Sequence, residues 1–183
     1  PYLIGDPTVG ALGYFTGALE LHDQVEARAL PIRHVFLPGS MGTTEAGFLM
    51  GNAVLGNPFT VHLPSVEYDR HELEAKISVI CEKSIAWSGL DCTVAQCMNS
   101  AVIYDNYLGD GYNVPTQASL EALRLAASLE GMVLENTYTS KTFACLIDLA
   151  RRNSLPSNDG LCFIHTGGVP ALFAQQGFIE EVF

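Results

Sequence analysis

Residues 33–44, with the sequence RHVFLPGSMGTT, decide the fold of this chain. The first five, residues 33–37, predict a short buried strand, because the last three of them are apolar without interruption. The rest are small or polar, and they lead into residues 45–55, whose apolar spacing predicts a helix. A strand that passes through a small-residue turn into a helix is typical of the repeating unit of a parallel α/β sheet.

The same alternation continues on both sides of this stretch. Further helices are predicted at residues 10–30, 66–87, 116–130 and 139–152, and further strands at 1–4, 59–63, 100–104, 132–134 and 161–165. Strands separated by helices predict an α/β fold with a mostly parallel sheet, helices on both faces and right-handed crossovers. Ligands in such sheets bind beyond the carboxyl ends of the strands, where the glycine-rich turns of this chain fall.

The composition excludes several classes of partner. Hydrophobic residues make up 48 % and charged residues 16 %, which indicates a globular chain with much buried surface. The net charge of −11 opposes binding to nucleic acid or to anionic lipid. No apolar run approaches the roughly 20 residues that span a bilayer, and no signal peptide opens the chain. We therefore expect a cytoplasmic protein with neither nucleic acid nor membrane as partner.

Cysteine and histidine patterns give no indication of a metal centre. The five cysteines form no C-x-x-C pair, and the five histidines show no H-E-x-x-H spacing. We expect reduced cysteines, most of them in the core, and no metal. The chain opens on Pro1 rather than Met, so we expect that processing or truncation has removed sequence before it.

The turn from Gly39 to Thr43 is a candidate anion site. Unpaired N–H groups and the dipole at the start of the following helix favour a phosphate, and glycines let the backbone approach it. No Lys follows the second glycine, as a Walker loop would require, and Met41 breaks a G-x-G-x-x-G pattern. A kinase or nucleotide-binding domain is therefore disfavoured, while a plain strand-to-helix turn remains an alternative.

Three other features are candidates of lower specificity. Thr166 lies before Gly167 and Gly168 at the end of the last predicted strand, where a tight turn is the alternative to a ligand site. Tyr112 and Tyr138 lie at loop positions, where tyrosines more often serve surface packing. Lys141 begins a helix, and we expect its side chain to be solvated.

Taken in order, these segments resemble the fold-type II pyridoxal-phosphate enzymes, specifically the D-cysteine desulfhydrase and aminocyclopropane-carboxylate deaminase family. The similar stretches are residues 10–14, 39–43, 111–115, 129–131, 138–141 and 163–173. The resemblance implies a tryptophan synthase beta-like fold and pyridoxal 5'-phosphate as cofactor. It also implies that residues 1–183 form the C-terminal part of the enzyme, within its large cofactor domain.

The resemblance assigns roles to individual residues. Gly39, Ser40, Met41, Gly42 and Thr43 would bind the cofactor phosphate. Thr166 would face the pyridine nitrogen, and Tyr112 and Tyr138 would be catalytic residues beside a small amino-acid substrate.

The reaction implied is α,β-elimination. At position 139 this chain has Thr, as in the desulfhydrases it resembles, whereas the deaminases tend to have Glu. The implied reaction therefore converts D-cysteine to pyruvate, ammonia and sulfide. A neutral hydroxyl at the pyridine nitrogen makes the ring a weaker electron sink, which suits elimination.

The sequence also departs from the family. The Schiff-base lysine of the family lies in an Asn-Lys-x-Arg-Lys motif that is absent here, and the only lysines are Lys76, Lys83 and Lys141. Met41 and Ser140 stand where the family usually has Gly. We therefore expect a fold that is incomplete in this chain and an activity that depends on an N-terminal chain or missing segment carrying the lysine, in a homo- or hetero-oligomer. The alternatives are a non-catalytic homologue acting as a binding or stabilising subunit, or a deaminase-like ring opening.

Overall fold

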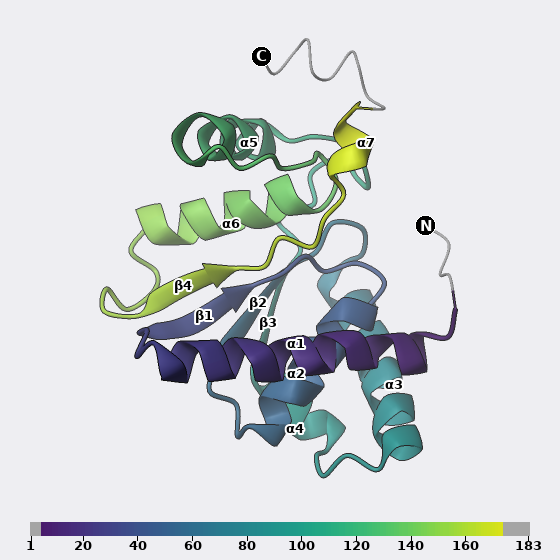
Figure 1. Cartoon of the computed structure of the whole chain (residues 1–183). Helices are drawn as coiled ribbons and strands as arrows, with labels where there is room; N and C mark the ends of the chain where they lie inside the picture. Colours follow the sequence, from purple (N-terminus) through teal and green to yellow (C-terminus); the bar gives the residue numbers. More distant parts are fainter. Residues whose placement is uncertain (1–4, 174–183) are drawn as a thin grey trace.

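The computed structural model describes residues 5–173, so the strand expected at residues 1–4 lies outside the described residues. Four parallel strands form one sheet in the order β3-β2-β1-β4 (Figure 1). They are β1 (Ile32–Phe36), β2 (Thr60–Pro64), β3 (Ala101–Tyr104) and β4 (Gly160–Phe163). The prediction of an α/β fold with a parallel sheet is confirmed.

Helices cover both faces of this sheet. One face carries α1 (Pro7–Ala27), α2 (Thr43–Val54), α3 (Arg70–Ser88) and α4 (Val94–Asn99). On the other face lies α6 (Thr139–Arg151), with α5 (Gln117–Glu130) packed on its outer side, and the short α7 (Val169–Phe173) follows β4 (Figure 1). The loops that carry the candidate site residues therefore lie at the carboxyl edge of the sheet, which is enclosed between two layers of helices.

Three elements differ from those predicted. Residues 132–134 form no strand, because a three-residue apolar run has no neighbouring strand here and the Val133 carbonyl lies 2.8 Å from His165 Nε2 instead. The third helix begins at Arg70 rather than at residue 66, since the Asp69 side chain accepts the Glu72 N–H and fixes the start. The prediction missed α4, which begins with a capping box between Thr93 and Gln96.

The main core lies between the sheet and the α1–α4 layer. Gly47 and Gly51 of α2 let this helix touch α1. A Cβ atom at Gly47 would overlap the Ala11 carbonyl, and one at Gly51 would lie 2.6 Å from the Phe15 carbonyl oxygen. This close packing places the start of α2, and with it the loop after β1, against α1. Four of the five cysteines are buried and Cys162 is half-buried, as predicted for core thiols.

Residues 5–173 lack two kinds of feature, a membrane-spanning helix and a metal cluster. No helix in that range has the length and apolar character needed to cross a membrane. No group of three or more His, Cys, Asp or Glu side chains in that range is placed to hold a metal ion.

A chain of polar side chains, with two buried histidines at its centre, crosses the sheet on the α6 side. His34 Nδ1 lies 3.0 Å from His62 Nε2, and His34 Nε2 lies 3.3 Å from an Asp159 carboxylate oxygen. His62 Nδ1 lies 2.9 Å from the Tyr104 hydroxyl, and the His62 ring stacks on Phe36 at 4.4 Å. Burial, followed by the neighbouring His34, lowers the pKa of His62 to about 4. His62 is therefore neutral in the folded protein at neutral pH.

We expect this histidine to make the fold acid-sensitive. Because the folded pKa of His62 is about 4, below the ordinary 6.5, its contribution is complete above pH 6.5 and is lost as the pH falls toward 4. The full loss amounts to about 3 kcal/mol. Urea unfolding at about pH 7 and about pH 5 should show a smaller drop in unfolding free energy for His62→Gln than for the wild type. The control His71→Gln, which changes an exposed histidine on α3, should keep the wild-type drop.

Candidate functional site

One cavity brings together three segments that are distant in sequence. It has a volume of about 280 Å³ and lies beyond the carboxyl ends of β1 and β4. Its lining residues are Pro38, Ser40, Met41, Thr43, Thr44, Glu45, Tyr138, Thr166, Gly167 and Gly168. Of the predicted cofactor-binding residues, Ser40, Met41, Thr43 and Thr166 thus line the cavity. Gly39 and Gly42 belong to the same loop without lining it.

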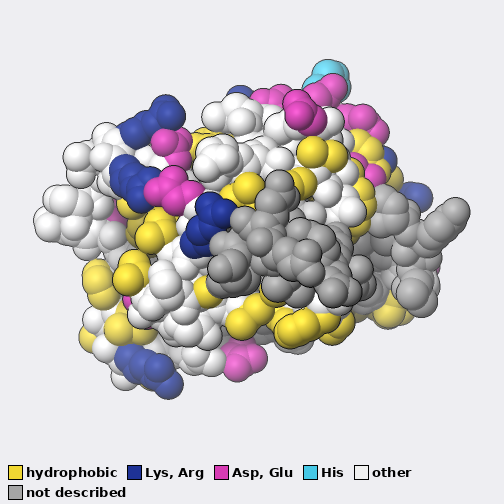
Figure 2. Space-filling view, turned by 90° about the horizontal axis from the view of Figure 1, so that it is seen from above, with side chains coloured by type: hydrophobic (Ala, Val, Ile, Leu, Met, Phe, Trp, Pro, Cys, Tyr) yellow, Lys and Arg dark blue, Asp and Glu magenta, His cyan; other side chains and the backbone are white. Residues whose placement is uncertain are grey.

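A larger cavity, of about 370 Å³, lies between α5, α6 and the segment before α5. Its charged side chains are already paired, since Arg151 lies 2.8 Å from Glu121 and Arg152 lies 2.7 Å from Asp148. Figure 2 views the molecule from the α5 side and shows basic and acidic side chains interspersed on that face. This cavity offers no concentrated charge for a ligand, so the smaller cavity is the better candidate.

The two glycines of the β1–α2 loop pack closely against α3. A Cβ atom at Gly39 would lie 2.6 Å from the Leu73 side chain. Gly42 has φ +91°, in the left-handed region, and a Cβ atom there would lie 3.1 Å from Ile80 and 3.3 Å from the Ile77 nitrogen. These contacts with α3 are one reason for glycine at both positions. The sequence-based explanation, that these glycines admit a phosphate, stays a prediction.

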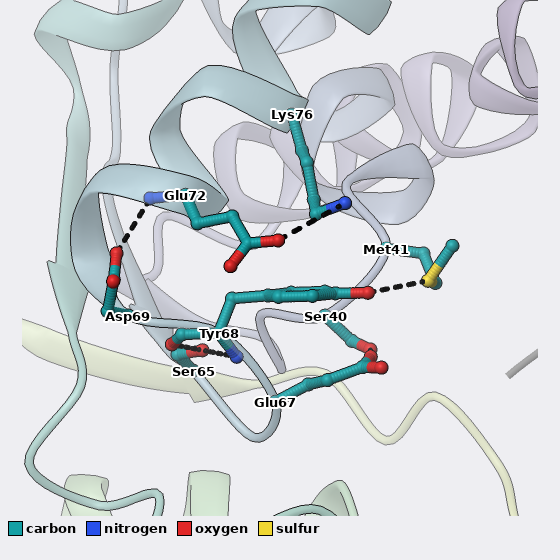
Figure 3. Close-up of polar contacts among 8 residues, drawn as sticks. All are labelled: Ser40, Met41, Ser65, Glu67, Tyr68, Asp69, Glu72 and Lys76. Carbon is teal, nitrogen blue, oxygen red and sulfur yellow. Dashed lines mark hydrogen bonds and ion pairs between the residues drawn. The ribbon is translucent and has the colours of Figure 1, made fainter.

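Residues of the β2–α3 connection fasten this loop (Figure 3). The Ser40 hydroxyl donates to Glu67 Oε2 at 2.8 Å, and the Tyr68 hydroxyl donates to the Met41 sulfur at 3.5 Å. Lys76 Nζ lies 4.3 Å from the centre of the Tyr68 ring and 3.6 Å from the Glu72 carboxylate. The loop is thus held in place before any ligand arrives.

Glu45 is a site residue that the sequence analysis missed. It lies in the first turn of α2 and is only 2 % exposed, and its Oε1 accepts the Ser40 N–H at 2.5 Å. Burial raises the pKa of Glu45, while hydrogen bonds from the N–H groups of Ser40, Glu45 and Gly42 act in the opposite direction. An acidic residue in the first turn of a helix is common because it complements the dipole, so its position alone gave no signal.

The two predicted catalytic tyrosines meet at their hydroxyl groups. Their oxygen atoms lie 2.5 Å apart, and their rings are arranged edge to face. Tyr138 lines the cavity, whereas Tyr112 is 38 % exposed at its outer side. Burial, and then the hydrogen bond with Tyr112, raises the pKa of Tyr138. The Tyr138 hydroxyl is therefore protonated at neutral pH.

A second buried carboxylate, Glu135, positions Tyr138. It is 1 % exposed and accepts the backbone N–H groups of Thr137, Tyr138 and Thr139 at 2.6, 2.8 and 2.6 Å. Its Cγ lies so near Gly168 that a Cβ atom there would come within 2.6 Å. Glu135 thus fixes both the start of α6 and the turn after β4. The sequence gave no sign of it, because its three donors follow it in a turn without a recognisable motif.

Comparison with known proteins supports the resemblance. The sequence profile of a family described as "Pyridoxal-phosphate dependent enzyme" matches residues 2–167. The chain belongs to this family. D-cysteine desulfhydrases of Salmonella newport and Salmonella typhimurium are each 37 % identical to it over 177 residues, which cover 95 % of this chain and 52 % of theirs. The chain therefore spans about half the length of these relatives.

A solved structure described as an ACC deaminase homologue shows the same fold. It matches with a TM-score of 0.82 at 24 % sequence identity, over 96 % of this chain and 51 % of the other. The fold-type II architecture and the pyridoxal-phosphate-dependent family predicted from the sequence are thereby confirmed.

None of the three lysines of this family member lines the cavity. Lys141 is fully buried, and its Nζ donates to the carbonyls of Leu108 and Gly111, each at 2.8 Å. Burial lowers its pKa, opposed by the charge of Glu135. The expectation of a solvated Lys141 is wrong, because this side chain ties α6 to the segment that carries Tyr112. Lys76 and Lys83 lie on α3, outside the cavity lining.

The cavity fits a phosphate ester in most respects. Thr43 Oγ1 is buried and has no hydrogen-bond partner within residues 5–173, so it can donate to a ligand without breaking another bond. The hydroxyl-bearing residues Ser40 and Thr44 share the lining, and α2 begins at Thr43. The exception is the Glu45 carboxylate, which already occupies the Ser40 N–H.

We expect the loss of Glu135 to weaken the fold around Tyr138. Glu135→Ala removes the acceptor of three backbone N–H groups and should lower the unfolding free energy by about 2 kcal/mol or more, as measured by urea unfolding. Glu135→Gln keeps one acceptor oxygen and should cost less. The control Glu130→Ala, at the exposed end of α5, should leave stability nearly unchanged, and an equal loss there would contradict the assignment.

Proposed function

We propose that this chain forms the phosphate-binding and pyridine-facing side of a pyridoxal-phosphate site. In this proposal the site carries out α,β-elimination on a small D-amino acid, with D-cysteine as the favoured substrate. The observation that carries the proposal is the convergence of the β1–α2 loop, Tyr138 and Thr166 on one cavity. The similarity to D-cysteine desulfhydrases supports the choice of reaction.

The binding roles follow from the lining of the cavity. The hydroxyls of Thr43 and Thr44, with the N–H groups at the start of α2, would hold the phosphate. Thr166 lines the same cavity, on the turn after β4, and its neutral hydroxyl would face the pyridine nitrogen. Pyridoxal phosphate, when bound, withdraws electrons from the amino-acid Cα and so permits the β-substituent to leave.

The tyrosine pair would supply the proton that the leaving group takes up. Tyr138 Oη holds its proton at neutral pH and borders the cavity, so it can donate that proton to the departing sulfur. Tyr112 Oη lies 2.5 Å away on the solvent side and can return a proton to Tyr138. Asn113 Oδ1 accepts from the Thr137 hydroxyl at 2.7 Å, which holds the two tyrosine-bearing segments together.

In this proposal the Schiff-base lysine comes from an N-terminal chain or segment in a homo- or hetero-oligomer. A non-catalytic homologue that binds or stabilises a partner is the second candidate. The observation that favours it is that Lys76, Lys83 and Lys141 all lie outside the cavity lining. Sequencing any chain that co-purifies with the protein, with assay of pyruvate and sulfide from D-cysteine, separates the two candidates. A companion with an Asn-Lys-x-Arg-Lys motif and measurable product favours the enzyme.

We expect no lysine of this chain to bind the cofactor covalently in stoichiometric amount. Lys141 Nζ is engaged by two carbonyls, and Lys76 is engaged by Glu72 and Tyr68. The test adds pyridoxal phosphate to the purified chain, reduces with borohydride and maps the modified peptides by mass spectrometry. Only slight labelling, rising with reagent concentration, is expected at the exposed Lys83. Full labelling of Lys141 would show that this lysine serves the site.

We expect Tyr138→Phe to lower turnover of D-cysteine by the assembled enzyme by about 10²–10⁴-fold, since it removes the proton donor. The thermal midpoint should change little, because the lost hydroxyl bonds to a partially exposed partner. Tyr107→Phe is the matched control, since it removes a hydroxyl that bonds to Asp148 outside the cavity. Wild-type turnover in Tyr138→Phe would return this residue to a packing role.

A further inference from the structure

The proposed function leaves Glu45 without a role, although its carboxylate lies among the donors of the proposed phosphate site. Its Oε1 accepts the Ser40 N–H at 2.5 Å, and the N–H groups of Gly42 and Glu45 also favour its charged form. These N–H groups stand at the start of the twelve-residue helix α2, where an anion is stabilised. A carboxylate of the chain itself therefore takes the position of an anionic ligand.

No positive side chain compensates for this carboxylate. Neither Lys nor Arg is among the cavity-lining residues of the described chain. The ionisable groups around Glu45 are Tyr14 on α1, whose pKa is raised by burial and by Glu45, and Tyr138 before α6. Glu67, from the β2–α3 connection, accepts the Ser40 hydroxyl on the other side of the same residue. An arriving phosphate would thus meet one buried negative charge directly and a second one nearby.

Glu45 has little room to accommodate a phosphate while it stays charged. Glu45 is only 2 % exposed, so water screens its charge poorly. Two anions that share one set of N–H donors repel each other, and one of them must leave or take up a proton. Protonation is accessible, because burial already raises the pKa of Glu45.

We propose that Glu45 is an internal anion that competes with the cofactor phosphate for the N–H donors of the β1–α2 loop. Binding of a phosphate ester then requires that Glu45 be protonated or displaced. This inference rests on the proposed function, since it concerns the same cavity. It predicts that affinity for a phosphate ester rises as the pH falls, and that binding is accompanied by proton uptake at Glu45.

The test measures binding of pyridoxamine 5'-phosphate, which lacks the aldehyde and so forms no Schiff base with lysine, by titration calorimetry. Wild type and Glu45→Gln are compared at about pH 8 and about pH 5.5, in buffers of different ionisation enthalpy that report proton uptake. At the higher pH, Glu45→Gln should bind about tenfold more tightly than wild type. The gain should shrink at the lower pH, and the variant should take up fewer protons.

Two controls isolate the effect. Glu74→Gln removes the same charge from an exposed position on α3 and should bind like wild type. Pyridoxamine, which lacks the phosphate, should gain no affinity from Glu45→Gln. Glu45→Ala serves as a second variant, and circular dichroism with the thermal midpoint shows that each protein is folded.

The outcomes separate this inference from the proposed function. Equal affinities and equal proton uptake in wild type and folded Glu45 variants would overturn the role of Glu45 while leaving the phosphate site in place. An equal gain for pyridoxamine would likewise overturn it, because the competition is with phosphate. Absence of pyridoxamine 5'-phosphate binding by every folded variant at both pH values would overturn the phosphate site and this inference together.

Discussion

The cavity depends on the buried carboxylate of Glu135. Its acceptance of three consecutive N–H groups sets the direction in which the chain enters α6, and so the position of Tyr138. Its contact with Gly168 sets the turn after β4, and so the position of Thr166. This one side chain thus contacts both segments that face the β1–α2 loop. Lys141 extends the same support, because it anchors the segment of Tyr112 to α6.

The two buried glutamates of the site therefore differ in what they leave available to a ligand. Glu135 finds its donors within its own turn and leaves the cavity open. Glu45 finds its donor, the Ser40 N–H, within the group that a ligand would need. The difference arises from backbone geometry, because both residues are nearly inaccessible and both are satisfied by main-chain N–H groups. In the proposed phosphate site, a polar group that the fold satisfies well would thus also oppose the ligand.

The sequence predicted the parts of the structure that depend on local pattern. The strand predicted at residues 33–37, which the structure places at 32–36, its small-residue turn and the following helix could be recognised because apolar runs and glycines mark them directly. The strand predicted at residues 132–134 failed because a strand needs a partner, and no local pattern shows whether one exists. Glu45, Glu135 and Lys141 escaped prediction for a related reason. Each has a charged group whose role is set by backbone atoms that the fold brings to it.

The polar chain from Asp159 through His34 and His62 to Tyr104 has a further consequence for how the strands pair. Its hydrogen bonds join side chains of β1, β2 and β3 and of Asp159, the residue before β4, so the whole polar chain forms only when these segments are aligned as observed. A slip of one residue in β1, β2 or β3 would turn its polar side chain toward the largely apolar core under the α1–α4 layer, away from its partners in the polar chain. Apolar side chains alone would tolerate several alignments. These four polar residues thus favour one register of the strands, and so determine which loops meet at the carboxyl edge of the sheet.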